Sequence, residues 1–349
     1  MRAVLGERLQ AVRPVSGTDS RRLTERIFRI RESGIIAVLL VFVAITAAIQ
    51  PRFLGSANVS FILVNTTVFA LLALGETLVV ITRNVDLSVG SVLGLSAYVS
   101  ASLFGQVHGI AIPLVFLTGL GIGLACGISN GLMVSLGRVP SLVVTLATLY
   151  IVRGIDILIV GGNEVVAQTL PNSFIQISRA SVAGIPYLAI VIAVVIGIGA
   201  YYLRSFRSGR ELYAIGSSPE AARLAGIRVG RRVLFAFALS GAIAGLAGVL
   251  WAGEYQTIDS TAGTGYELQV VAAVVVGGVA IFGGSGSVVG AAVGALLLST
   301  ITSALYVLRI SPFWDQAIAG FLLLTAIALD RAIAVRLLRA LRIRSSRAT

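Results

Sequence analysis

Residues 204–232 read RSFRSGRELYAIGSSPEAARLAGIRVGRR and separate two long apolar runs, 185–203 and 233–252. Apolar runs of this length match the ~20 residues that a helix needs to cross a ~30 Å hydrocarbon core. The segment between them carries seven arginines. Because basic loops stay on the cytoplasmic side of a membrane, we expect this segment to be a cytoplasmic loop between two transmembrane helices.

Most of the remaining positive charge lies at the two ends of the chain. The 349 residues include 27 Lys+Arg against 15 Asp+Glu, a net charge of +12, and every one of the 27 is arginine. Eight arginines fall in 1–33 and six in 329–349, so these tails and the loop hold 21 of the 27. The positive-inside rule places all three in the cytoplasm. An even number of spans must then precede the loop and an even number must follow it.

The hydropathy of the chain satisfies this parity. Hydrophobic residues make up 57% of the sequence and charged residues only 12%, about half the charged fraction of a soluble domain. We therefore expect an all-α integral membrane protein with about ten transmembrane helices, six before the loop and four after it. A broken or re-entrant helix near 75–95 would change this count by two. The runs are 34–50, 61–81, 87–104, 110–135, 141–160, 185–203, 233–252, 267–283, 288–307 and 313–329.

These runs predict three parts of the chain. Residues 1–33 form a basic cytoplasmic tail, 34–330 a single transmembrane domain, and 331–349 a second basic cytoplasmic tail. The polar stretch before residue 34 is longer than the n-region of a usual signal peptide. We therefore expect the first apolar run to be retained as a membrane span.

The composition also excludes several kinds of chemistry. Without lysine the chain cannot form a P-loop or a Schiff base. One histidine, His108, and one cysteine, Cys126, cannot supply the usual ligands of a zinc site or an intrachain disulfide. Topology already accounts for the positive charge, so we expect no nucleic-acid partner. The sequence thus predicts no P-loop, Schiff-base or zinc site, and we expect the chain to hold no cofactor or metal of its own.

The 39 glycines cluster inside the apolar runs, as in Gly119, Gly121, Gly123 and Gly127. Small residues let helix backbones approach closely in lipid, where hydrophobic association between helices is weak. We interpret most of these glycines as helix-packing positions.

A charged turn, TRNVDLSVGS at 82–91, joins the second and third predicted spans. Arg83 and Asp86 would neutralise one another if the turn is helical. Alternatively, Asp86 or Ser88 accepts backbone N–H groups at the start of the third helix. The turn could be purely structural, or it could contact a transported substrate.

Polar residues inside the second span raise the same question. Glu76 is an intramembrane carboxylate, which is by default a functional hypothesis. It could also reach water at the cytoplasmic end or bond a neighbouring helix. Six polar residues could line a path, although each is better interpreted as a hydrogen bond between helices: Asn65, Thr66, Thr67, Asn130, Thr145 and Thr148. The candidates for a translocation path or a structural turn are Asn65, Glu76, Arg83, Asn84, Asp86 and Ser88.

Within the loop, Ser218, Pro219 and Glu220 predict the start of a helix, as N-cap, first helical residue and acidic first turn. Gly226 predicts its end. A helix of about two turns is marginal alone in water. It is either a solvated surface helix or, as we favour, an element that docks into a partner.

This short helix resembles the coupling element of ABC-importer permeases, through Glu220-Ala221-Ala222 and Gly226-Ile227. The 86–91 turn, together with 265–268 and the glycine-rich 277–287, is similar to the ribose-type sugar permeases. The resemblance covers about 34–330.

Two further segments favour one subgroup of that family. Thr82-Arg83-Asn84 and the 308–314 turn look most like the autoinducer-2 and rhamnose permeases. Many relatives carry a glycine-rich stretch where Arg83-Asn84 stands.

The resemblance implies a subunit that is not an enzyme and that has an ABC-importer permease fold in the bacterial cytoplasmic (inner) membrane. Its partners would be a second permease, identical or a sister chain, an ABC ATPase that carries ATP and Mg, and an extracytoplasmic sugar-binding protein that delivers a small sugar. Permeases for branched-chain amino acids share this architecture. An ion-coupled secondary transporter is a further alternative, with Glu76 as its coupling carboxylate. The residues implied to couple to the ATPase are Pro219, Glu220, Ala221, Ala222, Arg223, Gly226 and Ile227.

Overall fold

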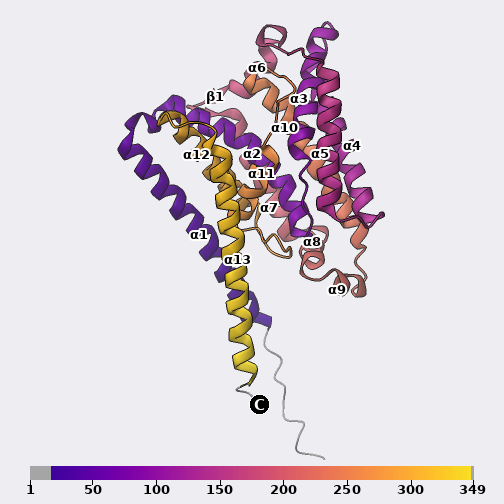
Figure 1. The fold of residues 1–349 in the computed structure, drawn as a ribbon, viewed down its shortest axis with the longest axis vertical. Helices are drawn as coiled ribbons and strands as arrows, with labels where there is room; N and C mark the ends of the chain where they lie inside the picture. Colours follow the sequence, from indigo (N-terminus) through magenta and orange to yellow (C-terminus); the bar gives the residue numbers. More distant parts are fainter. Residues whose placement is uncertain (1–16, 347–349) are drawn as a thin grey trace, which may run out of the picture.

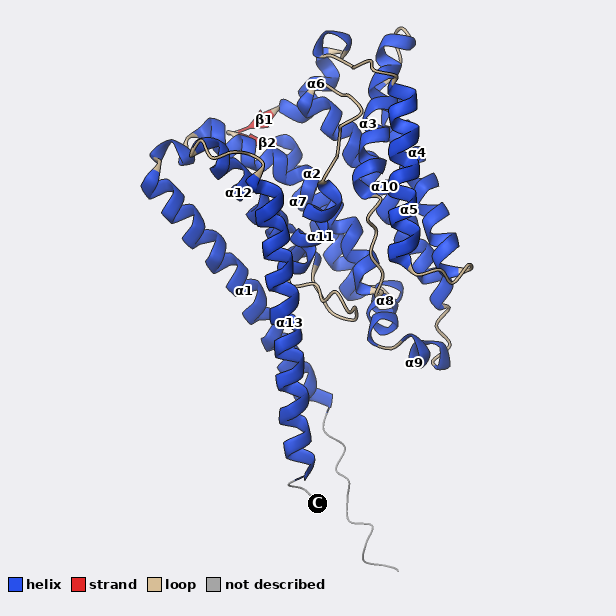
Figure 2. Cartoon of the chain, in the orientation of Figure 1, coloured by secondary structure: helices blue, strands red, loops and turns tan. Residues whose placement is uncertain are grey.

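The structure is a computed structural model that describes residues 17–346, with side chains described for 33–328 and 331–332. It is almost entirely helical (Figure 2), apart from a hairpin of two-residue strands. The elements are α1 (Gly17–Ile49), η1 (Pro51–Leu54), α2 (Ser56–Ile81), α3 (Val89–Gln106), α4 (Ile112–Ser135), α5 (Ser141–Val160), η2 (Ala167–Thr169), α6 (Asn172–Arg179), β1 (Ser181–Val182), β2 (Ile185–Pro186), α7 (Tyr187–Ser205), α8 (Arg207–Ser217), α9 (Pro219–Leu224), α10 (Val229–Tyr255), α11 (Tyr266–Val276), α12 (Val288–Val307) and α13 (Trp314–Ser346).

Six helices among the described residues are long and apolar enough to cross a membrane: α2, α4, α5, α7, α10 and α12. Three shorter apolar stretches, 33–49, 266–276 and 314–328, join them. The predicted runs 141–160 and 288–307 coincide with α5 and α12. The expectation of an all-α membrane protein is therefore confirmed in outline.

The predicted span 267–283 is wrong at its C-terminal end, because α11 stops at Val276. Gly278, Gly283 and Gly284 adopt φ values of 91°, 76° and 78°, a region that glycine enters at no steric cost. The chain therefore continues from α11 as a loop over 277–287.

Helices α2 and α10 form the centre of the molecule. They lie between α3, α4 and α5 on one side and α1, α12 and α13 on the other (Figure 1). The described ends of α1 and α13 lie at the same end of the molecule as α9 (Figure 1). The expected boundaries at residues 33 and 330 fall inside α1 and α13, so the structure does not mark them. Most arginine side chains of the two tails lie outside the described residues.

Helices α4 and α10 pack more extensively than any other described pair. Their contact is a seam of glycines, in which a Cβ at Gly123 would overlap the carbonyl oxygen of Gly241. Gly119 and Gly127 face the same helix, whereas Gly121 faces open space. Backbone-to-backbone contact of this kind gains van der Waals packing in lipid. The predicted role of the glycines is confirmed for this helix, Gly121 excepted.

Two separate helices, α2 and α3, meet in the segment near 75–95, as the runs 61–81 and 87–104 predict. Helix α2 continues to Ile81, and the chain then doubles back so that the Asp86 N–H donates to Glu76 Oε1 at 3.1 Å. Helix α3 therefore begins beside the interior of α2, not at its end. The amino end of α11 lies at the same place, since the carbonyl oxygen of Gly263 would be 2.6 Å from a Cβ at Gly90.

Candidate functional site

The loop between α7 and α10 contains the predicted short helix. Ser218 Oγ accepts the Ala221 N–H at 3.2 Å, Pro219 is the first helical residue, and Gly226 has φ +79°. The capping prediction is confirmed for α9, Pro219–Leu224. Leu224 is 91% exposed, although leucine is normally buried.

The other residues proposed for coupling, in α9 and just after it, differ in their burial. Ala222 is buried against the rest of the chain, and Ile227 is half-buried. Glu220, Ala221, Arg223 and Gly226 are exposed. The structure thus presents most of the motif to solvent and uses Ala222 to hold the helix in place.

A second helix in this loop, α8, has no counterpart in the sequence prediction. Leu212, Ile215 and Gly216 are buried at helical spacing, which is the signal that could have revealed it. Glu211 accepts from Arg207 at 2.9 Å and from Arg232 at 2.6 Å. Burial raises the pKa of Glu211, but the two arginines lower it by more, so the net pKa lies below its usual value. These contacts tie α8 to the start of α10.

We call the contact region of α8, the end of α2 and the 277–287 loop the inner junction. The Gly284 N–H donates to the carbonyl of Ile81 at 2.9 Å, and Tyr213 OH donates to the carbonyl of Gly286 at 2.9 Å. Burial raises the pKa of Tyr213 to about 12, so its hydroxyl stays protonated. A Cβ at Gly216 would overlap both Ile81 and Gly284. The junction is therefore a backbone-level contact with no room for adjustment.

Arg83 belongs to the inner junction and not to an ion pair. Its Nε donates to the carbonyl of Gly216, and its Nη2 donates to the carbonyl of Ser217 at 2.7 Å. The interpretation that Arg83 neutralises Asp86 is wrong, because Arg83 has φ +66° and its side chain extends to α8. A guanidinium holds carbonyl oxygens well because its donors form a fixed planar fork.

Asp86 instead prepares the start of α3. Its Oδ1 accepts the Ser88 N–H at 3.0 Å and the Ser88 hydroxyl at 2.6 Å. Ser88 Oγ accepts from Asn130 Nδ2 at 2.9 Å, and Thr148 Oγ1 donates to Asn130 Oδ1 at 2.6 Å. The interpretation that Asp86 accepts a backbone N–H at the start of α3 is confirmed, whereas the Ser88 side chain caps no backbone N–H. The hydrogen bond between helices is confirmed for Asn130 and Thr148. It is wrong for Thr66 and Thr67, whose hydroxyls donate to carbonyls within α2.

Glu76 is fully buried beside this turn. Its Oε1 accepts the Asp86 N–H, whereas its Oε2 has no hydrogen-bond partner among the described residues. No described arginine lies within ion-pair distance of either acid. The amino end of α3 is the nearest place that favours the negative charge of these two carboxylates, because the helix dipole places partial positive charge there. The structure brings Glu76, Asp86 and Ser88 together at the start of α3.

Asn65 and Asn84 lie apart from this group. Asn65 is 6% exposed and its Oδ1 accepts from Tyr255 OH at 3.4 Å. Asn84 Nδ2 donates to Thr82, to the carbonyl at 3.1 Å and to Oγ1 at 2.9 Å. The six polar candidates therefore fall in three places: the outer part of α2, the buried turn and the inner junction.

The structure also shows an intramembrane ion pair that the sequence analysis missed. Arg153 Nη1 lies 3.5 Å from Asp156 Oδ2 in α5, with side chains 16% and 0% exposed. Arg153 Nη1 also donates to the carbonyls of Ser260 and Ala262, at 3.1 and 2.7 Å. Two charges three residues apart inside an apolar run were the available signal. The pair fastens the 256–265 loop to α5.

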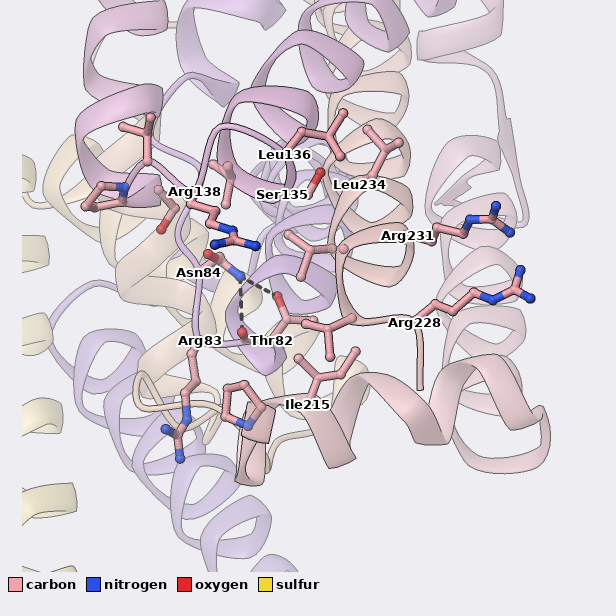
Figure 3. Close-up of a pocket in the computed structure, with 18 of the residues that line it drawn as sticks. Thr82, Arg83, Asn84, Ser135, Leu136, Arg138, Ile215, Arg228, Arg231 and Leu234 are labelled. Atoms are coloured by element: carbon pink, nitrogen blue, oxygen red, sulfur yellow. Dashed lines mark hydrogen bonds between the residues drawn. The ribbon is translucent and has the colours of Figure 1, made fainter. Parts of the chain in front are cut away.

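A pocket of about 1100 Å³ opens beside the inner junction (Figure 3). The 82–84 turn, the end of α4, the loop after it, α8, α9 and the start of α10 form its walls. Every charged residue that lines it is an arginine. In Figure 3 Arg138 lies beside Asn84, whereas Arg228 and Arg231 project together toward the opposite side. The five are Arg83, Arg138, Arg223, Arg228 and Arg231.

The described residues thus combine an exposed short helix, a pocket lined by arginines and a bundle of apolar helices. Residues 58–327 match the family described as the permease component of the branched-chain amino acid transport system. The chain belongs to this permease family. It is a multi-pass membrane permease and not a catalytic enzyme.

Individual permeases are similar over most of their length. The autoinducer 2 import system permease protein LsrC of Enterobacter sp. (strain 638) is 35% identical over 298 residues, 85% of each chain. The protein of the same name from Escherichia coli (strain K12 / DH10B) is 34% identical over 310 residues, 89% of each chain. The one from Salmonella typhi is 34% identical over 310 residues, 89% of this chain and 88% of the relative. The resemblance to autoinducer-2 permeases is confirmed. No solved structure matches the chain.

Proposed function

We propose that this permease is the membrane-spanning subunit of an ATP-driven importer for a small sugar-like polyol of the ribose, rhamnose or autoinducer-2 class. The observation that carries the proposal is the 34–35% identity to autoinducer 2 import permeases across at least 85% of the chain. An alignment of this length includes both the transmembrane helices and the α8–α9 loop.

The topology that fits this function has ten crossings of the bacterial cytoplasmic membrane, with both termini inside. The crossings are α1, α2, α3, α4, α5, α7, α10, α11 with the 256–265 loop, α12 and α13. The shared position of α9 and the described ends of α1 and α13 supports it (Figure 1), as does the excess of arginine in the same segments.

Energy for transport comes from a separate ATPase, which binds ATP and Mg²⁺, because this chain lacks the lysine of a P-loop. The exposed face of α9 and the cationic pocket are the surfaces that it would engage. A displacement of α8 and α9 would reach α2 and the buried turn through the inner junction. Through that route Glu76, Asp86 and Ser88 would respond to the ATPase without touching it.

The remaining partners complete the pathway. A second permease, identical or a sister chain, encloses the translocation path, and an extracytoplasmic binding protein delivers the sugar. The free energy of ATP hydrolysis switches the path between outward and inward access, which requires that the partners bind the two states differently.

Uptake into proteoliposomes tests the proposal. We would reconstitute the chain with and without its ATPase and binding protein, and supply radiolabelled autoinducer-2, ribose, rhamnose and leucine. The expected result is uptake of a polyol that needs both partners and internal ATP. Uptake of leucine instead would make the cargo an amino acid, as the family description reads. Uptake by the chain alone on an ion gradient would overturn the ATP-driven mechanism.

A further inference from the structure

Four aromatic side chains from three helices gather around Asn65 in the outer part of the molecule. Phe69 of α2 stacks on Tyr266 of α11, with ring centroids 4.6 Å apart and planes at 27°. Trp251 and Tyr255 of α10 stack at 4.4 Å and 21°. We call Asn65, Phe69, Trp251, Tyr255 and Tyr266 the outer aromatic cluster.

A directed chain of hydrogen bonds links the polar ends of these side chains. Trp251 Nε1 can only donate, and it lies 3.1 Å from Tyr266 OH. Asn65 Oδ1 can only accept, and it lies 3.4 Å from Tyr255 OH. The two tyrosine hydroxyls are 3.5 Å apart, so Tyr266 donates to Tyr255. The two N–H groups of Asn65 Nδ2 make no hydrogen bond with any other described residue, so they remain free for a ligand.

The cluster is largely buried, Asn65 included, and Tyr255 is its exposed member. Phe69 and Trp251 are 4% and 8% exposed, whereas Tyr255 is 40% exposed. Asn65 lies nine residues after the first residue of α2, about 14 Å along the helix axis. Aromatic side chains of a membrane-interface belt direct their polar groups to the headgroup level. In the outer aromatic cluster, by contrast, the hydroxyls of Tyr255 and Tyr266 bond each other, and Tyr255 also bonds Asn65.

We propose that the outer aromatic cluster is where the permease first binds its sugar, with one face of the sugar ring against the exposed aromatic surface and hydroxyls on Asn65 Nδ2 and Tyr255. This inference rests on the proposed function and names the residues that contact its substrate. Aromatic walls with a few placed polar groups are what small-molecule sites use for affinity and orientation. Neutral donors and acceptors suit a polyol, which carries hydroxyls and no charge.

Tryptophan fluorescence provides a direct test, because the chain contains only Trp251 and Trp314. A Trp314→Phe protein keeps Trp251 as its one tryptophan. We would titrate the full-length variant in lipid nanodiscs with ribose, rhamnose and autoinducer-2, and with leucine for comparison. The expected result is a saturable change in Trp251 emission with one or more of the polyols and none with leucine.

Two further substitutions in the Trp314→Phe protein test whether the change in Trp251 emission comes from a sugar bound at the cluster. Tyr255→Phe removes one hydroxyl, and Asn65→Ala removes the free amide. Each is expected to weaken binding about fivefold, the effect of one lost hydrogen bond. Tyr150→Phe is the matched control, because Tyr150 is 73% exposed on α5, away from the cluster. It should leave the titration unchanged.

Uptake by the complete transporter separates the two proposals. If a polyol is imported while Trp251 emission does not respond to it, or while neither substitution changes the titration, the cluster is structural and this inference fails alone. If only leucine is imported, the proposed function fails as well. Should Asn65→Ala give an aggregated protein, Tyr255→Phe alone decides the question, since it removes a single atom from a side chain that is 40% exposed.

Discussion

Helices α8 and α9 lie next to each other in one loop, yet the rest of the chain holds them very differently. Leu212 and Ile215 of α8 are 0% and 1% exposed, and Gly216 touches the backbone of two other elements. Leu224 of α9 is 91% exposed, and only Ala222 is buried.

The difference divides one loop between two tasks. Helix α8 has no freedom to move without moving α2 and the 277–287 loop. Helix α9 offers its residues to a partner and depends on its own caps for local structure. A force applied to α9 would therefore pass into the membrane domain through α8, which is the arrangement that an ATPase-driven switch requires.

The largest effect is expected at the tightest point of α8. Gly216→Ala places a Cβ in overlap with Ile81 and Gly284, and overpacking of this kind costs about 1–3 kcal/mol. We expect a lower yield of folded protein and a lower apparent Tm in detergent. Gly197→Ala is the matched control, because a Cβ there meets nothing within 4 Å and alanine favours a helix. Equal stability of the two variants would show that α8 is not locked.

On α9 we expect loss of transport without loss of the protein. Gly226→Asp and Glu220→Arg change exposed residues of the coupling motif, so the variants should reach the membrane normally while uptake and sugar-stimulated ATPase activity fall to background. Gly226→Asn is the control, since asparagine tolerates the left-handed conformation and adds no charge. Normal transport in the first two variants would end the coupling role of α9.

Arg83 connects the two regions, so its loss should give a partial defect. Arg83→Gln keeps one hydrogen-bonding amide but loses the guanidinium fork that holds Gly216 and Ser217. We expect ATPase activity to continue while uptake falls several-fold, which is the pattern of uncoupling. Arg52→Gln, at an exposed arginine in η1, is the matched control. A parallel fall in both activities would indicate a folding defect instead.

The smallest effect concerns the ion pairs of α8 with Arg207 and Arg232. The pKa of Glu211 is lowered in the folded protein, so these pairs stabilise the fold above the unfolded pKa of about 4.5 and are lost as pH falls through the folded value. Glu211→Gln should lower the apparent Tm by about 1–3 °C at pH 7. The Tm difference from wild type should vanish below the folded pKa. Glu164→Gln, in an exposed outer loop, should have no effect at either pH.

What the sequence could predict here depends on how local each signal is. The caps of α9 were readable because Ser218, Pro219 and Gly226 act within one short helix. The partners of Arg83 were not, since Gly216 lies 133 residues away along the chain and no pattern near Arg83 points to it. The predicted pairing of Arg83 with Asp86 used only residues close in the sequence, and it was wrong because the true partners of Arg83 are distant in the sequence.

The membrane core shows the same limit. Apolar runs located most helices, because length and hydropathy are properties of one segment. The end of α11 at Val276 depends on the glycines that follow it, and the cluster around Asn65 depends on the packing of three helices. The Arg153–Asp156 pair is a different case, because its spacing within one helix was visible in the sequence.

The short helix α11 and the packing of the segment before it against α3 have a consequence for how the protein is made. Helix α11 has 11 residues, about 16 Å in length, and cannot cross a ~30 Å hydrocarbon core alone. Helix α3 begins where Gly263 will later pack against Gly90, so its amino end lacks that neighbour until the ribosome has made the other half of the chain. We therefore expect a nascent chain released after residue 255 to be degraded rapidly in a pulse-chase experiment, and one released after residue 307 to persist. Stable folding of this permease would then occur late in synthesis, because the first half of the chain packs fully only after the second half has been inserted in the membrane.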